Sequence, residues 1–132
     1  MRKKILFVDD EGDWRFIPSL YLKDAGYDVL TAKNGTDALF QSQDVQLSLI
    51  ILDIHLAGEN GVTLMRLFKR NHPHVPIILY TGHEHDEASV AEMLKEGAYQ
   101  YLRKGTMGDL LKAVQGALGE LPAAPPPPDF SV

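Results

Sequence analysis

The chain contains 132 residues, of which 45% are hydrophobic and 23% charged, a length and balance typical of a single globular domain. It contains no cysteine, which excludes disulfide frameworks, thiolate metal sites and cysteine nucleophiles. Its formal net charge of −5 argues against direct binding to nucleic acid or to an anionic membrane. The first apolar run covers only residues 5–8, too short for a signal peptide or membrane helix, and we expect a cytoplasmic protein.

A continuous apolar run at residues 5–8 is typical of a strand buried on both faces. Apolar residues at helical spacing then predict a helix over residues 14–25, which Gly26 should end. Pro18 lacks a backbone donor and should cause a kink or a late start of this helix. The predicted buried stripe comprises Trp14, Ile17, Pro18, Tyr21, Leu22 and Ala25.

A weaker apolar run at residues 29–32 predicts an edge strand. Either Asn34 or Thr36 is expected to cap a short second helix that runs to Gln43, because both side chains can accept a hydrogen bond from a free amide of the first turn. Residues 49–52 form another continuous apolar run, which predicts a second strand buried on both faces.

The second half of the domain continues this alternation. A third helix is predicted around residues 61–68 and a fourth around 90–98, with a buried stripe of Val90, Ala91, Leu94 and Ala98 and with Gly97 near its end. Strands are predicted at 77–80 and, more weakly, at 99–102. The last helical stripe comprises Leu110, Val114, Ala117, Leu118 and Leu121.

A proline-rich segment follows this last helix. Residues 122–132 read PAAPPPPDFSV and hold five of the eight prolines. Because a proline run favours an extended conformation and cannot continue a helix, we predict a folded domain over residues 3–121 and a tail or linker over 122–132.

Strict alternation of strands and helices predicts an α/β fold, a parallel sheet with helices on both faces. Right-handed crossovers place all the strand-to-helix loops at the carboxyl edge of such a sheet, where ligands bind. Four strand ends bring polar residues to this edge, namely Asp9, Asp10, Asp53, Thr81 and Lys104.

This combination of residues has a specific chemistry. Clustered carboxylates repel one another unless a cation lies among them, and an all-oxygen ligand set suits Mg²⁺. A carboxylate nucleophile, Mg²⁺, a lysine and a hydroxyl are the groups needed to transfer a phosphoryl group to an aspartate. Any one of these residues alone would be a solvated turn or surface residue, but their joint placement indicates a site.

The sequence resembles the receiver domain of two-component response regulators over essentially all of residues 3–121. The matching segments are ILFVDDE at 5–11, LIILDIHLAGENG at 49–61, ILYTG at 78–82, EGAYQYLRKG at 96–105 and DLLKAV at 109–114. The resemblance implies a flavodoxin-like, doubly wound sheet of five parallel strands in the order 2-1-3-4-5, with five helices. It also implies a phosphoryl-accepting switch rather than a metabolic enzyme, with self-phosphorylation and self-dephosphorylation activity.

The resemblance also implies roles for individual residues. Asp53 is the phosphoacceptor and, with Asp10, a direct ligand of Mg²⁺, whereas Asp9 acts through water and the backbone carbonyl of His55 completes the protein ligands. Thr81 and Lys104 bind phosphoryl oxygens.

Tyr101 matches the switch aromatic of the family, which turns inward when the hydroxyl of Thr81 moves to the phosphoryl group, a population shift driven by new contacts. His55 and His83 lie two residues after Asp53 and Thr81, and the resemblance implies that side chains at these two positions tune the lifetime of the phosphoryl group.

The phosphoryl donor implied by the resemblance is a sensor histidine kinase or a phosphotransfer protein, and the recipient of the signal is a downstream protein or an output domain not in this chain. The face formed by the fourth helix, fifth strand and fifth helix is a candidate homodimer surface. Gly105 and Ala57 depart from the family, which usually has proline after the conserved lysine and often in the loop after the phosphoacceptor.

Three other functions are alternatives. A Mg²⁺-dependent aspartyl phosphatase would have an acid at position 55, where this chain has histidine. A nucleotide-binding flavodoxin-like domain would have a glycine-rich loop after the first strand, where this chain has acidic DDEGDW. A degenerate receiver would act only as a protein-interaction module.

Two histidine pairs, His72 with His74 and His83 with His85, have spacings that suit a transition metal. Both pairs fall in predicted loops, and no distant ligand cluster accompanies them along the sequence. We therefore expect these imidazoles to be solvated.

Overall fold

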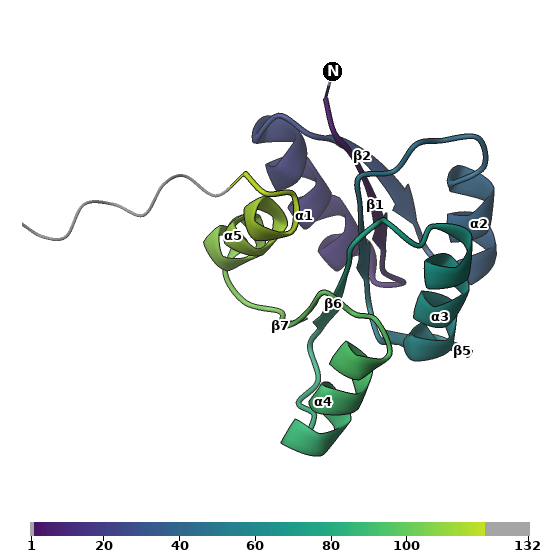
Figure 1. Ribbon diagram of the computed structural model, residues 1–132. Helices are drawn as coiled ribbons and strands as arrows, with labels where there is room; N and C mark the ends of the chain where they lie inside the picture. The colour runs from purple at the N-terminus through teal and green to yellow at the C-terminus, as the bar shows by residue number, and fades with distance from the viewer. Residues whose placement is uncertain (1, 121–132) are drawn as a thin grey trace, which may run out of the picture.

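The computed structural model describes residues 2–120, which form a parallel sheet covered by helices on both faces (Figure 1). The strand order is β2-β1-β3-β6-β7, the predicted order 2-1-3-4-5 when the five strands of this sheet are counted along the chain. The fold prediction is therefore confirmed. The strands are β1 (Lys4–Val8), β2 (Asp28–Ala32), β3 (Leu49–Leu52), β6 (Ile77–Thr81) and β7 (Gln100–Arg103).

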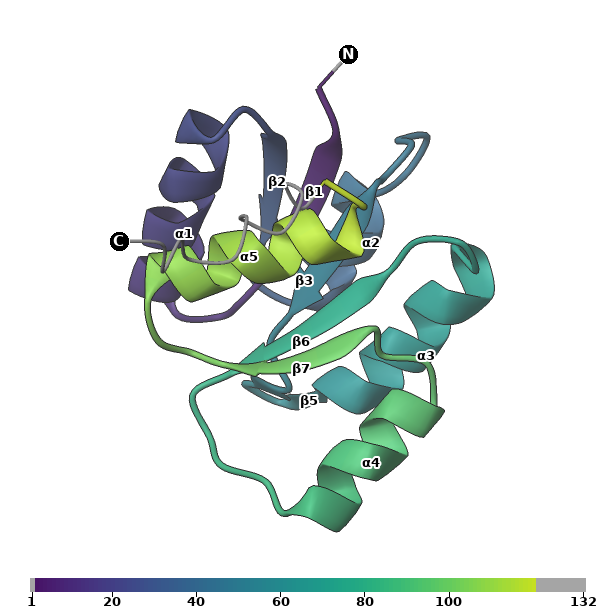
Figure 2. The same cartoon turned by 60° about the vertical axis from the view of Figure 1, so that its left-hand side comes forward.

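Five helices cover the sheet, with α1 and α5 on one face and α2, α3 and α4 on the other (Figures 1 and 2). Successive strand residues point to opposite faces, so Ile5 and Phe7 pack under the first layer and Leu6 and Val8 under the second. The helices are α1 (Gly12–Asp24), α2 (Gly35–Gln41), α3 (Gly61–Asn71), α4 (Glu87–Lys95) and α5 (Met107–Ala117).

A small antiparallel hairpin follows β3 and was not predicted. It consists of β4 (His55–Leu56) and β5 (Glu59–Asn60), joined through Gly58, whose φ of 72° lies in the left-handed region that glycine adopts without strain. The side chain of Asn60 then accepts hydrogen bonds from the amides of Val62 and Thr63 and caps α3. Two-residue strands are too short to produce a readable alternation of polar and apolar residues.

The predicted start and buried stripe of α1 were partly wrong. The helix begins at Gly12 and includes Pro18, so there is no late start. Ile17 and Tyr21 are 55% and 38% exposed and Ala25 is also exposed, whereas Pro18 and Leu22 are buried. Phe16 and Leu20 also expose their side chains, because α1 carries more apolar residues than its narrow contact with the sheet can bury.

The stripe predicted for α4 was also wrong. Met93 is the buried residue of this helix, while Leu94 is 42% exposed and Val90 and Ala91 are not buried. The helix lies beside the edge of the sheet next to β7, so only one of its edges meets the core (Figure 2). Ala98, just beyond the helix, is buried as predicted.

The predicted helix signals near α2 and the glycine stops agree well with the structure. Asn34 caps α2 by accepting from the amide of Asp37 at 2.8 Å, and the helix ends at Gln41 rather than Gln43. Gly26 and Gly97 follow α1 and α4 with positive φ, as glycine helix stops do.

Leu121 and the predicted tail at 122–132 lie outside the described residues. Among residues 2–120, no helix has the length and hydropathy needed to cross a bilayer.

Candidate functional site

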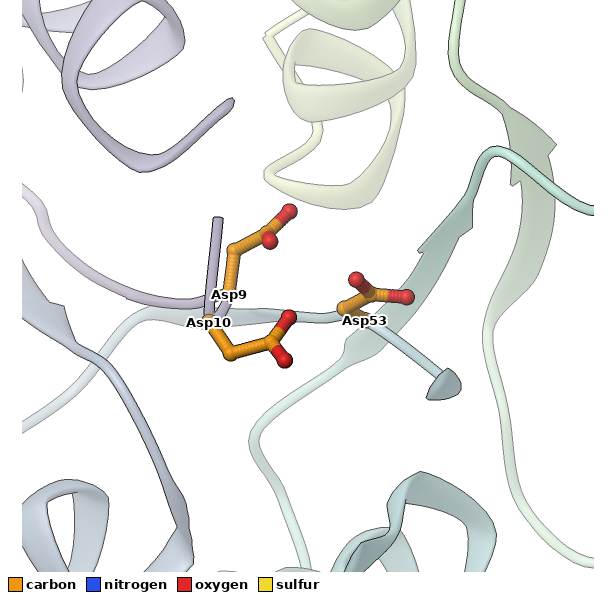
Figure 3. A group of neighbouring side chains, drawn as sticks. All are labelled: Asp9, Asp10 and Asp53. Carbon is orange, nitrogen blue, oxygen red and sulfur yellow. The ribbon is translucent and has the colours of Figure 1, made fainter. Parts of the chain in front are cut away.

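Three aspartates from two neighbouring strands meet at the carboxyl edge of the sheet. Asp9 and Asp10 follow β1, Asp53 follows β3, and the three side chains offer carboxylate oxygens that all lie within 4.8 Å of one another (Figure 3). Asp9 and Asp53 are only 1% and 4% exposed, while Asp10 is half-buried. Within residues 2–120 this is the one group of three or more such side chains close enough to share an ion.

Backbone amides hold each carboxylate in place. The amide of His55 donates to Asp53 Oδ1 at 3.0 Å, that of Ala57 to Asp10 Oδ2 at 2.9 Å and that of Glu11 to Asp9 Oδ1 at 3.0 Å. The loop through Ala57 thus bridges from the end of β3 to the end of β1. The arrangement leaves an oxygen-only donor set of the kind that hard divalent cations prefer, and Mg²⁺ fits it.

Lys104, after β7, neutralises part of this charge. Its Nζ lies 2.8 Å from Asp9 Oδ2 and 3.3 Å from Asp53 Oδ2, and its side chain is 5% exposed. The same ammonium lies 5.1 Å from the centre of the Trp14 ring, a cation–π contact. Two carboxylates and one aromatic ring therefore contact the Lys104 ammonium.

The charges of this cluster shift one another's pKa values. Burial raises the pKa of Asp9, and repulsion from Asp53 adds to this, while the hydrogen bonds from Lys104 and from the Glu11 amide act in the opposite direction. Burial on its own would lower the pKa of Lys104, but the hydrogen bond to Asp9 and the charges of Asp9 and Asp53 outweigh it and raise the pKa. Lys104 is therefore held as an ammonium.

Thr81 connects the last two strand ends. It is completely buried at the end of β6, its Oγ1 accepts from the amide of His83 at 3.1 Å, and its carbonyl accepts from the amide of Lys104 at 2.7 Å. These bonds set the start of the loop after β6 and the position of Lys104 together.

Tyr101, on β7, is half-buried beside this loop. Its hydroxyl donates to the carbonyl of His83 at 2.9 Å and lies 2.8 Å from Nδ1 of His85. The Nε2 atom of His85 in turn lies 3.1 Å from Nε2 of His55. Desolvation by its neighbours lowers the pKa of the exposed His55, and the charges of His83 and His85 lower it further against the opposing effect of Asp53.

A cavity of about 240 Å³ opens above the aspartates. Asp53 and Lys104 both line it and are nearly buried, so a small anion in the cavity would reach both. Asp9 and Thr81 are buried beside it rather than in its lining. The lining residues are Glu11, Trp14, Asp53, His55, Gly82, His83 and Lys104.

Every residue assigned to the site from the sequence lies at the carboxyl edge of the sheet. Two further residues that contact the site were not predicted to do so. Trp14 was predicted only as a core residue, and its contact with Lys104 depends on the approach of α1 to the end of β7. His85 was expected to be solvated, and its contacts with His55 and Tyr101 come from segments distant in the sequence.

Comparison with known proteins decides the family. Residues 5–115 match the family described as "Response regulator receiver domain". This chain is a receiver domain. The receiver domain is 37% identical, over 116 residues, to the nitrogen assimilation regulatory protein NtrX of Azorhizobium caulinodans, a match that covers 86% of this chain and 25% of NtrX. The chain thus spans about a quarter of the length of that relative.

Solved structures agree with this assignment. The receiver domain superposes on the chemotaxis protein CheY4 of Vibrio cholerae with a TM-score of 0.84 and 30% identity, covering 89% of this chain and 100% of CheY4. It superposes on TrrA of Thermotoga maritima, a response regulator solved in complex with Mg²⁺–BeF, with a TM-score of 0.78 and 30% identity, covering 88% of this chain and 99% of TrrA.

Proposed function

We propose that this receiver domain accepts a phosphoryl group on Asp53 from the phosphohistidine of a sensor histidine kinase or phosphotransfer protein, and later releases it by self-dephosphorylation. The observation that carries the proposal is the place of Asp53, which lines a cavity and whose carboxylate lies 3.3 Å from the ammonium of Lys104. An Asp53 oxygen would form the new O–P bond as the P–N bond of the donor breaks, and the donor imidazole would keep the electron pair of that bond.

Mg²⁺ is the cofactor that fits the cluster. Asp10 and Asp53 would bind it directly, Asp9 through water, and the backbone carbonyl of His55 would complete the protein ligands. Bound there, Mg²⁺ would neutralise charge on the transferring phosphoryl oxygens. The proposal is supported by the all-oxygen donor set and by TrrA, a similar structure solved with Mg²⁺–BeF.

The proposed switch uses Thr81, Lys104 and Tyr101. The Lys104 ammonium and the Thr81 hydroxyl would each bind a phosphoryl oxygen. Thr81 Oγ1 would then reorient from the amide of His83, with which it pairs at 3.1 Å. The Tyr101 hydroxyl donates a 2.9 Å hydrogen bond to the carbonyl of the same His83. A change at Thr81 would therefore reach Tyr101 through His83 alone. Phosphorylation thereby shifts the population of Tyr101 orientations.

The partners follow from the same proposal. The phosphoryl donor is a histidine kinase or phosphotransfer protein, and the signal passes to a downstream protein or to an output domain outside this chain. The face of α4, β7 and α5 is the proposed homodimer or partner surface, and Leu94 and Tyr99 expose large apolar side chains there. We assign the folded receiver to residues 3–121 and a tail or linker to 122–132.

The test is the intact mass of the protein after incubation with acetyl phosphate and Mg²⁺. The expected result is one added phosphoryl group on the wild type, and none on Asp53→Asn or without Mg²⁺. Asp44→Asn, at an exposed loop aspartate, is the matched control and should be phosphorylated like the wild type. If neither acetyl phosphate nor beryllofluoride modifies or binds the wild type, the domain is a degenerate receiver and the proposal is overturned.

A further inference from the structure

Two histidines that are 30 residues apart in the sequence face each other beside the cavity above Asp53, which His55 lines. The Nε2 atoms of His55, in the β4 hairpin, and His85, in the loop before α4, are 3.1 Å apart, and the two rings are nearly parallel, with an interplanar angle of 20°. The fold thus places His55 beside His85, so His55 is the distant ligand that the sequence did not reveal for the pair His83 and His85.

The hydrogen bonds of Tyr101 determine which nitrogen of His85 carries the proton. The tyrosine hydroxyl donates its one proton to the carbonyl of His83, so its oxygen accepts from Nδ1–H of His85 at 2.8 Å. In a neutral imidazole protonated on Nδ1, Nε2 carries the lone pair, and in His85 this lone pair accepts from Nε2–H of His55 at 3.1 Å. A metal ion bound by both Nε2 atoms would replace this proton, which would pass to Nδ1 of His55 or to solvent. Histidines that ligate metals almost always have their second nitrogen held by a bond like that of His85 Nδ1.

We propose that His55 and His85 bind a divalent transition-metal ion, with Zn²⁺ as the type case, through their Nε2 atoms, at a site separate from the acidic Mg²⁺ cluster. Imidazole ligands suit zinc, copper and nickel, whereas the carboxylates of Asp9, Asp10 and Asp53 suit harder ions. The proposed Mg²⁺ shell uses only the backbone carbonyl of His55, so the proposal about its imidazole does not rest on the proposed phosphorylation.

The geometry agrees with this assignment. Two Zn–N bonds of about 2.1 Å at a tetrahedral angle place their nitrogens about 3.4 Å apart, close to the 3.1 Å that separates the two Nε2 atoms. His55 is exposed and His85 half-buried, so an ion reaches them from solvent. The ring of His83, centred 4.1 Å from that of His55, is near enough to supply a third ligand after rotation, and water completes the shell.

The test is calorimetric titration of the full chain with Zn²⁺ in saturating Mg²⁺, which keeps the acidic cluster occupied. The wild type should bind one Zn²⁺ per chain, and His55→Gln and His85→Gln should each weaken binding by at least about tenfold. Tyr101→Phe, which removes the partner of His85 Nδ1, should weaken it by about tenfold. The matched control is the double variant His72→Gln with His74→Gln, which should bind as the wild type does.

A second readout identifies the atoms. Imidazole ¹⁵N spectra should show Zn²⁺ shifting the Nε2 resonances of His55 and His85, and should report the same folded protein in every variant. Retention of Zn²⁺ binding in Asp10→Asn would show that Zn²⁺ does not bind at the acidic cluster. Absence of Zn²⁺ binding in the wild type, retention of wild-type affinity in either single histidine variant, or loss of binding in the His72 and His74 control would each overturn the proposal and leave a hydrogen-bonded histidine pair.

Discussion

The amide of Gly61, the first residue of α3, donates a 2.9 Å hydrogen bond to the carbonyl of Ile54, the residue that follows Asp53. The backbones are so close that a Cβ at position 61 would lie 2.6 Å from the Cα of Ile54 and 2.7 Å from its carbonyl oxygen. Glycine is the only residue without a Cβ, so it permits the approach that holds the Asp53 segment against the start of α3.

Gly61→Ala should therefore destabilise the domain by about 1–3 kcal/mol, because the added carbon meets backbone atoms that cannot rotate away. Displacement of Asp53 should also slow its phosphorylation by acetyl phosphate. Urea unfolding and intact mass measure the two effects. Gly12→Ala is the matched control, since no heavy atom lies within 4 Å of a Cβ there, and its stability should change by less than about 0.5 kcal/mol. Equal stabilities of the two variants would contradict this prediction.

Lys104→Met should destabilise the metal-free protein by about 3 kcal/mol, because it leaves the buried carboxylates of Asp9 and Asp53 without their cation. Mg²⁺ should recover part of the loss, since it supplies positive charge to the same carboxylates. Urea unfolding with and without Mg²⁺ measures both effects. Lys112→Met, at an exposed position of α5, should change stability little and respond to Mg²⁺ as the wild type does. A Lys104→Met deficit that Mg²⁺ leaves untouched would refute this account.

His55→Ala and His83→Ala should shorten the lifetime of phosphorylated Asp53. The two rings, centred 4.1 Å apart, line the cavity above Asp53 and restrict the approach of the hydrolytic water. Loss of the phosphoryl group, followed by intact mass after removal of acetyl phosphate, should be several-fold faster in each variant. His74→Ala is the control and should retain the rate of the wild type. Unchanged rates in His55→Ala and His83→Ala would rule out a shielding role.

Glu120 should contribute stability that is lost in acid. Its carboxylate accepts from the Tyr27 hydroxyl at 2.8 Å and pairs with Lys3 at 3.0 Å, and these contacts lower its pKa below the ordinary 4.5. A lowered carboxylate pKa adds stability above pH 4.5 that disappears as the pH falls through the lowered value. Because Glu120 is largely exposed, solvent screening limits the contribution to below about 1 kcal/mol.

The comparison variant is Glu120→Gln, which keeps an acceptor for Tyr27 but removes the charge. The difference in unfolding free energy between wild type and variant should be largest near pH 7 and should vanish in acid. Urea unfolding across this range measures it. A difference that persists or grows below pH 4 would show that the charge of Glu120 is not its source.

The sequence by itself determined the five strands of the main sheet, the residues Asp9, Asp10, Asp53, Thr81 and Lys104, and the family. Continuous apolar runs report burial on both faces of a strand, and a residue that follows such a run must lie at the carboxyl edge. These are local relations, readable within a few residues of each position.

Only the tertiary structure decided which apolar residues of α1 and α4 are buried, that Lys104 lies against Trp14, and that His85 meets His55. The helical period shows which residues share a face, but the neighbouring layer decides which of two apolar faces turns inward, as the exposed Ile17 and buried Met93 demonstrate. Contacts between loops 30 residues apart depend on how β3 and β6 pair and where their loops turn, and no local pattern encodes that distance.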